Sequence, residues 1–176
     1  MDVERVLVLG GARSGKSRFA LEMVEEKKVP TIFCATGIPT DAEMEERIRR
    51  HQKERPPHCT TVEVPYGFAP LFSLSLSGKA VLLDCVSFLV SNILLQEGSE
   101  EQAYTRVVGE FGSLFSRQER ERFFLVLVSN EVGMGVVPEF PLGRAFRDLL
   151  GRVNQWLAER VNHVYFMVAG IPWKLK

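Results

Sequence analysis

The chemistry that this sequence can perform begins near its N-terminus, in a glycine-rich segment that carries one lysine and one serine. Residues 10–17 read GGARSGKS and match the pattern GxxxxGK[ST]. The segment follows the apolar run 6–9 and precedes a stretch with helical spacing, which is the context that a phosphate-binding loop (P-loop) requires. Backbone N–H groups of such a loop surround phosphate oxygens, and the positive end of the next helix faces them. A tight glycine turn with an incidental lysine is the alternative. The residues expected to hold the phosphates are Gly10, Gly11, Ala12, Arg13, Ser14, Gly15, Lys16 and Ser17.

Two oxygen-bearing side chains are candidates for holding Mg²⁺ beside these phosphates. The Ser17 hydroxyl ends the glycine-rich motif, and Asp84 closes the apolar run 81–83. An acid in that position resembles the carboxylate that binds Mg²⁺ directly or through water in nucleotide-binding proteins. Asp84 could instead cap the helix that follows it. We favour the metal role, with Lys16 bridging the outer phosphates.

A histidine in a cationic segment is the candidate nucleophile. His51 lies within residues 48–56, IRRHQKERP. Neighbouring cations favour the uncharged, nucleophilic imidazole, and they could gather phosphate oxygens around it. A lone histidine on a charged helix is more often a solvated residue, so both interpretations stay open on chemistry alone. The glycine-containing loop 129–135, SNEVGMG, could pass close to a ligand or be an ordinary surface connection.

The elements that must position these residues alternate along the whole chain. Strands are predicted over residues 6–9, 31–35, 60–64, 80–84, 123–128 and 164–168, and helices over 14–28, 41–54, 86–96, 100–121 and within 138–160. This order predicts an α/β fold of the P-loop NTPase type, a three-layer sandwich around a mostly parallel sheet, as one catalytic domain over residues 1–176. Ligands bind such sheets at the C-terminal strand ends, where Gly10, Thr36, Asp84 and Ser129 follow four strands.

Composition limits the partners and the compartment. Lys plus Arg and Asp plus Glu number 22 each, which argues against broad capture of nucleic acid. The three cysteines, Cys34, Cys59 and Cys85, show no CxxC spacing, so we expect reduced thiols in a cytoplasmic protein and no zinc site. Cys34 and Cys85 lie in apolar runs and are expected in the core. No apolar run is long enough to span a bilayer.

The motifs in this order resemble one family closely, the bifunctional adenosylcobinamide kinase/adenosylcobinamide-phosphate guanylyltransferases of cobalamin biosynthesis. The resemblance covers nearly the whole chain, and the His51 segment and residues 130–135 are its most specific parts. The matching segments are 10–18, 35–37, Glu43-Met44 with Arg47-Ile48, His51 with Arg55-Pro56, Thr61, Glu63, 83–85 with Asn92, 129–138, 146–148 and 151–155.

The resemblance implies two reactions on one nucleotide site. A nucleoside triphosphate, ATP or GTP, phosphorylates adenosylcobinamide, and GTP then guanylylates adenosylcobinamide phosphate through a covalent histidine–GMP intermediate on His51. Mg²⁺ is the implied cofactor, and a homo-oligomer, in this family a trimer, is the implied assembly. Cys59 and Arg50 depart from residues common in the family. The nucleotide contacts that carry over outside the P-loop are Ala35, Thr36, Gly37, Gln52, Lys53, Glu54, Arg55, Glu63 and Asp84.

Two other functions compete with this interpretation. A plain P-loop kinase or NTPase would leave His51 as a surface residue without covalent chemistry. A nucleotide-binding module could act through partners, with the amphipathic helix 100–121 as the contact, although a helix that packs on the sheet is the expected role.

Overall fold

The computed structural model describes residues 3–53 and 56–176, apart from the side chains of residues 44, 47, 50, 51 and 53. The described strands are β1 (Arg5–Gly10), β2 (Thr31–Ala35), β3 (Thr60–Glu63), β4 (Ala80–Asp84), β5 (Phe124–Asn130), β6 (His163–Val168) and β7 (Ile171–Lys174). The described helices are α1 (Lys16–Glu26), α2 (Ala42–Lys53), α3 (Val86–Glu97), α4 (Glu100–Glu121) and α5 (Pro141–Arg160), with a short 3₁₀ helix η1 (Ala69–Ser73).

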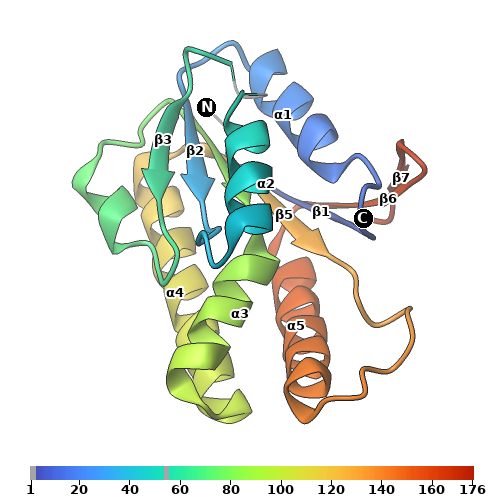
Figure 1. The fold of residues 1–176 in the computed structure, drawn as a ribbon. Coiled ribbons are helices and arrows are strands. Elements are labelled where there is room, and N and C mark those ends of the chain that lie inside the picture. The colour runs from blue at the N-terminus through green and yellow to red at the C-terminus, as the bar shows by residue number, and fades with distance from the viewer. Residues whose placement is uncertain (1–2, 54–55) are drawn as a thin grey trace.

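These strands form one sheet in the order β3-β2-β4-β5-β1-β6-β7. β1 to β6 pair in parallel, and β7 is antiparallel to β6. Helix α1 covers one face, and α3, α4 and α5 cover the other (Figure 1). The predicted three-layer sandwich around a mostly parallel sheet is therefore confirmed.

The central strands β1, β2, β4 and β5 are largely apolar because both of their faces are covered. Along β1, Val6 and Val8 point into the cluster beneath α1, while Leu7 points into the cluster beneath α3, α4 and α5. Helix α4 contributes Val107 and Phe111 to this second cluster, so it packs within the fold as expected. No helix within residues 3–53 and 56–176 is long and apolar enough to cross a membrane.

Several boundaries differ from the sequence-based prediction, and one strand was not predicted. Helix α1 starts at Lys16, after the left-handed residues Arg13 and Gly15, and so leaves the glycine-rich loop free of helix. Strand β5 continues to Asn130, because its pairing with β1 runs as far as Gly10 opposite Asn130. Strand β7 was not predicted. It forms because Ala169 and Gly170 adopt positive φ and turn the chain back onto β6.

Candidate nucleotide site

The conformation of the P-loop is fixed by crowding around its first glycine. A Cβ at Gly10 would lie 2.7 Å from the Met167 carbonyl oxygen and 2.7 Å from the Ser14 hydroxyl oxygen, so only glycine fits there. Gly15 has φ of 93° and turns the chain into α1. The Gly170 N–H donates to the Ser14 carbonyl at 3.0 Å, which holds the loop against the β6–β7 turn. The first N–H groups of α1 therefore face the opening of a preformed loop.

Lys16 lies across this loop and is almost fully buried, with 7% of its surface exposed. Its ammonium donates to the Gly11 carbonyl at 2.5 Å and to the Ser14 hydroxyl at 3.4 Å. These bonds hold a cation over the backbone that is expected to bind phosphate. An anion seated in the loop would meet both a positive side chain and the helix N-terminus.

The end of β5 is bonded to the elements on either side of it. The Glu131 N–H donates to the Gly10 carbonyl at 3.0 Å, which joins β5 to the start of the P-loop. The Asn130 N–H donates to the Ser87 hydroxyl at 2.9 Å, and the Asn154 amide donates to the Asn130 carbonyl at 3.1 Å. The C-terminal edge of the sheet is thus tied to α3 and α5 as well as to β1.

Thr36 ties the end of β2 to the start of α3. Its fully buried hydroxyl accepts from the Cys85 N–H and donates to the Cys85 carbonyl, both at 2.8 Å. The Asn92 amide donates to the carbonyls of Thr36 and Pro65, each at 2.9 Å. Helix α3 therefore fixes the turns that follow β2 and β3, and with them the wall of the groove described next.

A groove of about 430 Å³ opens between α2 and the ends of β2 and β3. It is lined by Gly37 after β2, by Ile48 and Gln52 on α2, and by Glu63 and Tyr66 at and after the end of β3. Three residues predicted to bind nucleotide, Gly37, Gln52 and Glu63, meet there. Tyr66 is 39% exposed and brings an aromatic ring to the same groove.

The comparisons with known proteins agree on one family. The family described as cobinamide kinase / cobinamide phosphate guanyltransferase matches residues 6–175. The chain belongs to this family. The bifunctional adenosylcobalamin biosynthesis protein CobU of Escherichia coli strain K12 is 41% identical over 180 residues, which cover 97% of this chain and 99% of that protein. Protein CobP of Pseudomonas aeruginosa is 39% identical over 98% of this chain and 97% of its own length. Protein CobU of Salmonella typhimurium strain LT2 is 39% identical over 97% of this chain and 99% of its own length.

Asp84, the carboxylate expected to hold the metal, lies at the same edge of the sheet as the P-loop. Asp84 ends β4, is half-buried, and pairs in register with Ala35 of β2 and Val128 of β5. Within the described part of the chain its carboxylate has no hydrogen-bond or ion-pair partner, so it is available to a ligand. β5 separates β4 from β1, which places Asp84 about 10 Å across the sheet from the end of β1.

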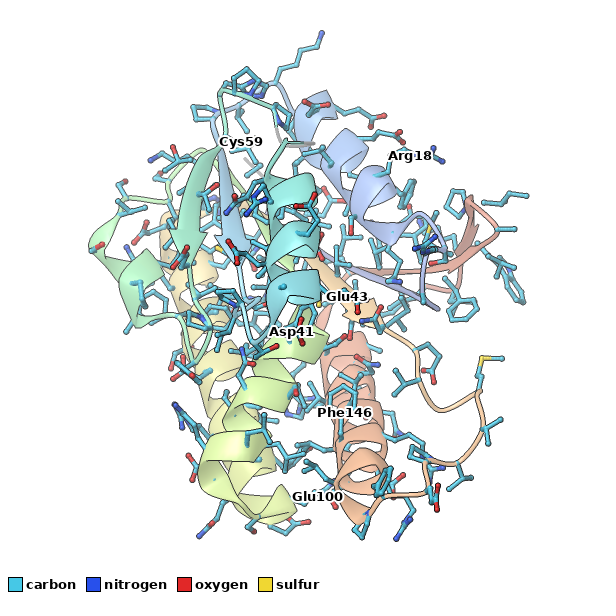
Figure 2. All side chains as sticks on the ribbon, in the orientation of Figure 1. Arg18, Asp41, Glu43, Cys59, Glu100 and Phe146 are labelled. Atoms are coloured by element: carbon cyan, nitrogen blue, oxygen red, sulfur yellow. The ribbon has the colours of Figure 1, made fainter. Side chains whose placement is uncertain are left out.

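Helix α2 carries the predicted nucleophile, His51. Helix α2 starts near the C-terminal edge, at Asp41 and Glu43, and runs back toward the level of Cys59 (Figure 2). The backbone of His51 is in the last turn of α2, toward the opposite edge of the sheet. The side chains of His51 and Lys53, and all of Glu54 and Arg55, lie outside the described residues, so their predicted roles stay predictions.

Sequence reasoning missed two features of the site. Tyr66 follows a short strand in a segment without a recognisable motif, and only the fold brings its ring to Gln52 and Glu63. The turn at Ala169 and Gly170 has a sequence signal, because a glycine lies there between two apolar stretches. That signal could have predicted the turn, but not its long-range hydrogen bond to Ser14. Such contacts depend on sheet order, which local pattern does not encode.

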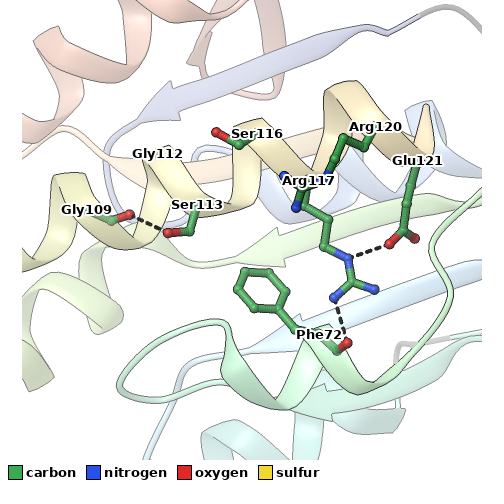
Figure 3. Close-up of a pocket in the computed structure, with 8 residues that line it drawn as sticks. All are labelled: Phe72, Gly109, Gly112, Ser113, Ser116, Arg117, Arg120 and Glu121. Carbon is green, nitrogen blue, oxygen red and sulfur yellow. Dashed lines mark hydrogen bonds and ion pairs between the residues drawn. The ribbon is translucent and has the colours of Figure 1, made fainter.

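A second hollow, between η1 and α4, contains none of the predicted site residues (Figure 3). Arg117 occupies it. Its guanidinium donates to Glu121 at 2.7 Å and to the Phe72 carbonyl at 2.6 Å, and it lies 5.1 Å from the centre of the Phe72 ring. These contacts attach η1 to α4, so we assign this hollow a structural role.

Burial disfavours the thiolate form of the cysteine beside Asp84. Burial, and then the negative charge of Asp84, raise the pKa of Cys85 to about 11, and burial alone raises the pKa of Cys34 to about 12. The thiol form of Cys85 is therefore favoured at neutral pH, and the thiol is a poorer nucleophile than the thiolate. Neither Cys34 nor Cys85 is therefore a candidate for covalent chemistry at this edge.

Reaction with 5,5′-dithiobis(2-nitrobenzoate) at pH 8 checks this thiol chemistry. We expect the native protein to react rapidly at Cys59 alone, because Cys59 is half-buried while Cys34 and Cys85 are buried. All three thiols should react once the protein is unfolded in guanidinium chloride. Cys59→Ser is the control and should abolish the rapid phase. A second rapid thiol in the native protein would contradict the assignment.

Proposed function

We propose that this chain carries both activities of its family on one nucleotide site. It phosphorylates the aminopropanol hydroxyl of adenosylcobinamide with a nucleoside triphosphate, and it then transfers GMP from GTP to the resulting phosphate. The preformed P-loop, in a chain that matches the family from residue 6 to residue 175, is the observation that carries the proposal.

The nucleotide spans from the P-loop to the groove beside α2. β5 and β4 separate β1 from β2, so these sites lie about 14 Å apart, within reach of an extended nucleoside triphosphate. The triphosphate lies on residues 10–17 beneath Lys16. The base lies in the groove, where the Glu63 carboxylate can accept from the two N–H groups on the pairing edge of guanine. Adenine presents an acceptor at one of those positions, so Glu63 favours GTP for the second reaction.

Guanylyl transfer proceeds in two displacements. An imidazole nitrogen of His51 attacks the α-phosphorus of GTP, a P–N bond forms, and the bond to the bridging oxygen breaks to release pyrophosphate. A phosphate oxygen of adenosylcobinamide phosphate then attacks the same phosphorus and the P–N bond breaks, which regenerates the histidine. Lys16 offsets negative charge on the phosphates in both steps.

For this reaction α2 has to carry His51 toward the nucleotide. Among the described side chains of α2, Ile48 alone is partly buried, and the others are exposed. Its contact runs to Gly37, where an added Cβ would lie 3.5 Å from the Ile48 side chain. A helix whose described side chains are mostly exposed can shift at small cost, and the nucleotide would supply new contacts at Gln52.

Mg²⁺ belongs to the same proposal. The Ser17 hydroxyl and the Asp84 carboxylate are oxygen ligands, which Mg²⁺ prefers, and it commonly retains waters that can span the distance between β1 and β4. No cluster of three or more His, Cys, Asp or Glu side chains occurs in the described residues, so phosphate oxygens would complete the coordination. When bound, Mg²⁺ neutralises phosphate charge. Ser17 and Asp84 would hold it beside Lys16.

Self-labelling with GTP tests the covalent step. Wild-type protein incubated with GTP labelled at the α-phosphate and then denatured should retain label that is acid-labile and alkali-stable. His51→Ala should retain none and should still phosphorylate adenosylcobinamide. His58→Ala, an exposed histidine in the loop that follows α2, is the matched control and should label like wild type. Equal labelling of His51→Ala would remove His51 from the mechanism.

Replacement of the P-loop lysine tests the shared site. Lys16→Ala should lower both activities by orders of magnitude, because the transferred phosphate loses the side-chain cation that the P-loop supplies. Lys174→Ala removes an exposed lysine from β7 and should leave both rates unchanged. Circular dichroism of the Lys16 variant establishes that it is folded. Normal turnover in that folded variant would refute the phosphate assignment.

Replacement of Asp84 tests the metal site by a binding measurement that does not depend on turnover. Calorimetry of GTP binding with and without Mg²⁺ should show that Asp84→Asn lowers the apparent Mg²⁺ affinity by about tenfold or more, as loss of an outer-shell ligand does. Glu159→Gln, at the far end of α5, should bind like wild type. An unchanged Mg²⁺ dependence in Asp84→Asn would remove Asp84 from the metal site.

A further inference from the structure

A run of large apolar side chains faces solvent between β5 and α5. Met134 is 81% exposed, Val136 94% and Phe140 73%, and Val137 and Leu142 are also exposed. We call these five residues the apolar loop. Single apolar residues on a surface are ordinary, but a concentration of this kind marks a site of interaction.

The apolar loop is held at both of its ends. At the start, the Glu131 N–H donates to the Gly10 carbonyl at 3.0 Å, and the Glu131 carboxylate accepts from the Gly133 N–H at 2.6 Å. At the end, the Arg144 guanidinium donates to the carbonyls of Pro138 at 3.1 Å and Glu139 at 2.6 Å. The exposure of the apolar side chains therefore belongs to a bonded loop.

The position of the apolar loop relates it to the nucleotide. It leaves the end of β5, the strand that lies between β1 with the P-loop and β4 with Asp84. Figure 1 shows the segment between β5 and α5 projecting beyond the strand end. The other exposed apolar group near the P-loop, at Ile171 and Trp173, lies on β7, on the side of β1 away from β4. The apolar loop is thus the exposed apolar group that continues directly from β5, the strand between the P-loop and Asp84.

We infer that the apolar loop is the docking surface for the corrin ring of the acceptor, an inference that rests on the proposed function. The reacting hydroxyl of adenosylcobinamide is at the end of a short arm on a wide macrocycle. The arm has to reach the phosphates while the ring stays outside the P-loop. The methyl-bearing periphery of the corrin ring needs an apolar surface outside the P-loop, and Val136 and Phe140 supply it. A second copy of the chain seated here would cover the route by which the acceptor enters.

The test compares acceptor binding with nucleotide chemistry in the same variants. Equilibrium dialysis of adenosylcobinamide against V136S/F140S should show affinity lowered by about tenfold or more, the loss expected when two apolar contacts are removed. The KM for adenosylcobinamide should rise in parallel. GTP affinity and self-labelling of His51 should not change. Leu175→Ser removes an exposed leucine whose N–H pairs with Val164 at the opposite end of β6, and it should match wild type throughout.

The outcomes separate this inference from the proposed function. If the wild-type chain binds no adenosylcobinamide, both are overturned. If wild type binds it and V136S/F140S binds it equally well, only the docking surface is overturned. If V136S/F140S sediments as a smaller species than wild type, the apolar loop is a contact between subunits and the inference is again overturned.

Discussion

The site depends on a lack of space at the end of β1. Gly10 lies between its own loop and β6, with the Met167 carbonyl on one side and the Ser14 hydroxyl on the other, and neither leaves room for a Cβ. Because Met167 belongs to a strand paired with β1 and Ser14 is bonded to the turn after that strand, neither can easily move away. The backbone that would receive phosphate is therefore shaped before any ligand arrives, and binding does not have to order it.

Sheet order then divides the site into parts. β5 separates the P-loop from Asp84, and β4 separates β5 from β2. The P-loop, the Asp84 carboxylate and the groove therefore follow one another along a single edge of the sheet. The buried Thr36 and the bonded end of β5 keep this edge rigid. Helix α2, which carries the proposed nucleophile, is by contrast mostly exposed among its described side chains. Rigidity on the phosphate side and freedom on the histidine side suit a reaction in which one group holds the phosphates and another approaches them.

Sequence patterns predicted the parts of the fold that local chemistry determines. The buried strands were predictable because parallel strands covered on both faces are apolar throughout, and α4 because Val107, Phe111 and Leu114 recur at helical spacing. β7 escaped prediction because residues 171–174, IPWK, contain a proline and are wholly exposed. Its pairing comes from the turn at Gly170. The predicted end of β5, at residue 128, was too early because Ser129 and Asn130 are polar. A polar Ser129 is favourable in this buried strand only because the fold brings in Asn154, which accepts a hydrogen bond from the Ser129 hydroxyl.

The same reasoning separates what was predictable in the site from what was not. The P-loop and Asp84 could be predicted because each is a local signal at the end of an apolar strand. The groove could not, since Tyr66 and Gln52 become neighbours only after β3 returns to pair with β2. The position of His51 illustrates the limit most clearly. Its cationic surroundings suggested a nucleophile, yet the direction of α2 sets its distance from the phosphates, and that direction follows from where β2 ends and β3 begins. The chemistry of a residue can be inferred from its neighbours in sequence, whereas its distance from the phosphates depends on the order and direction of the strands.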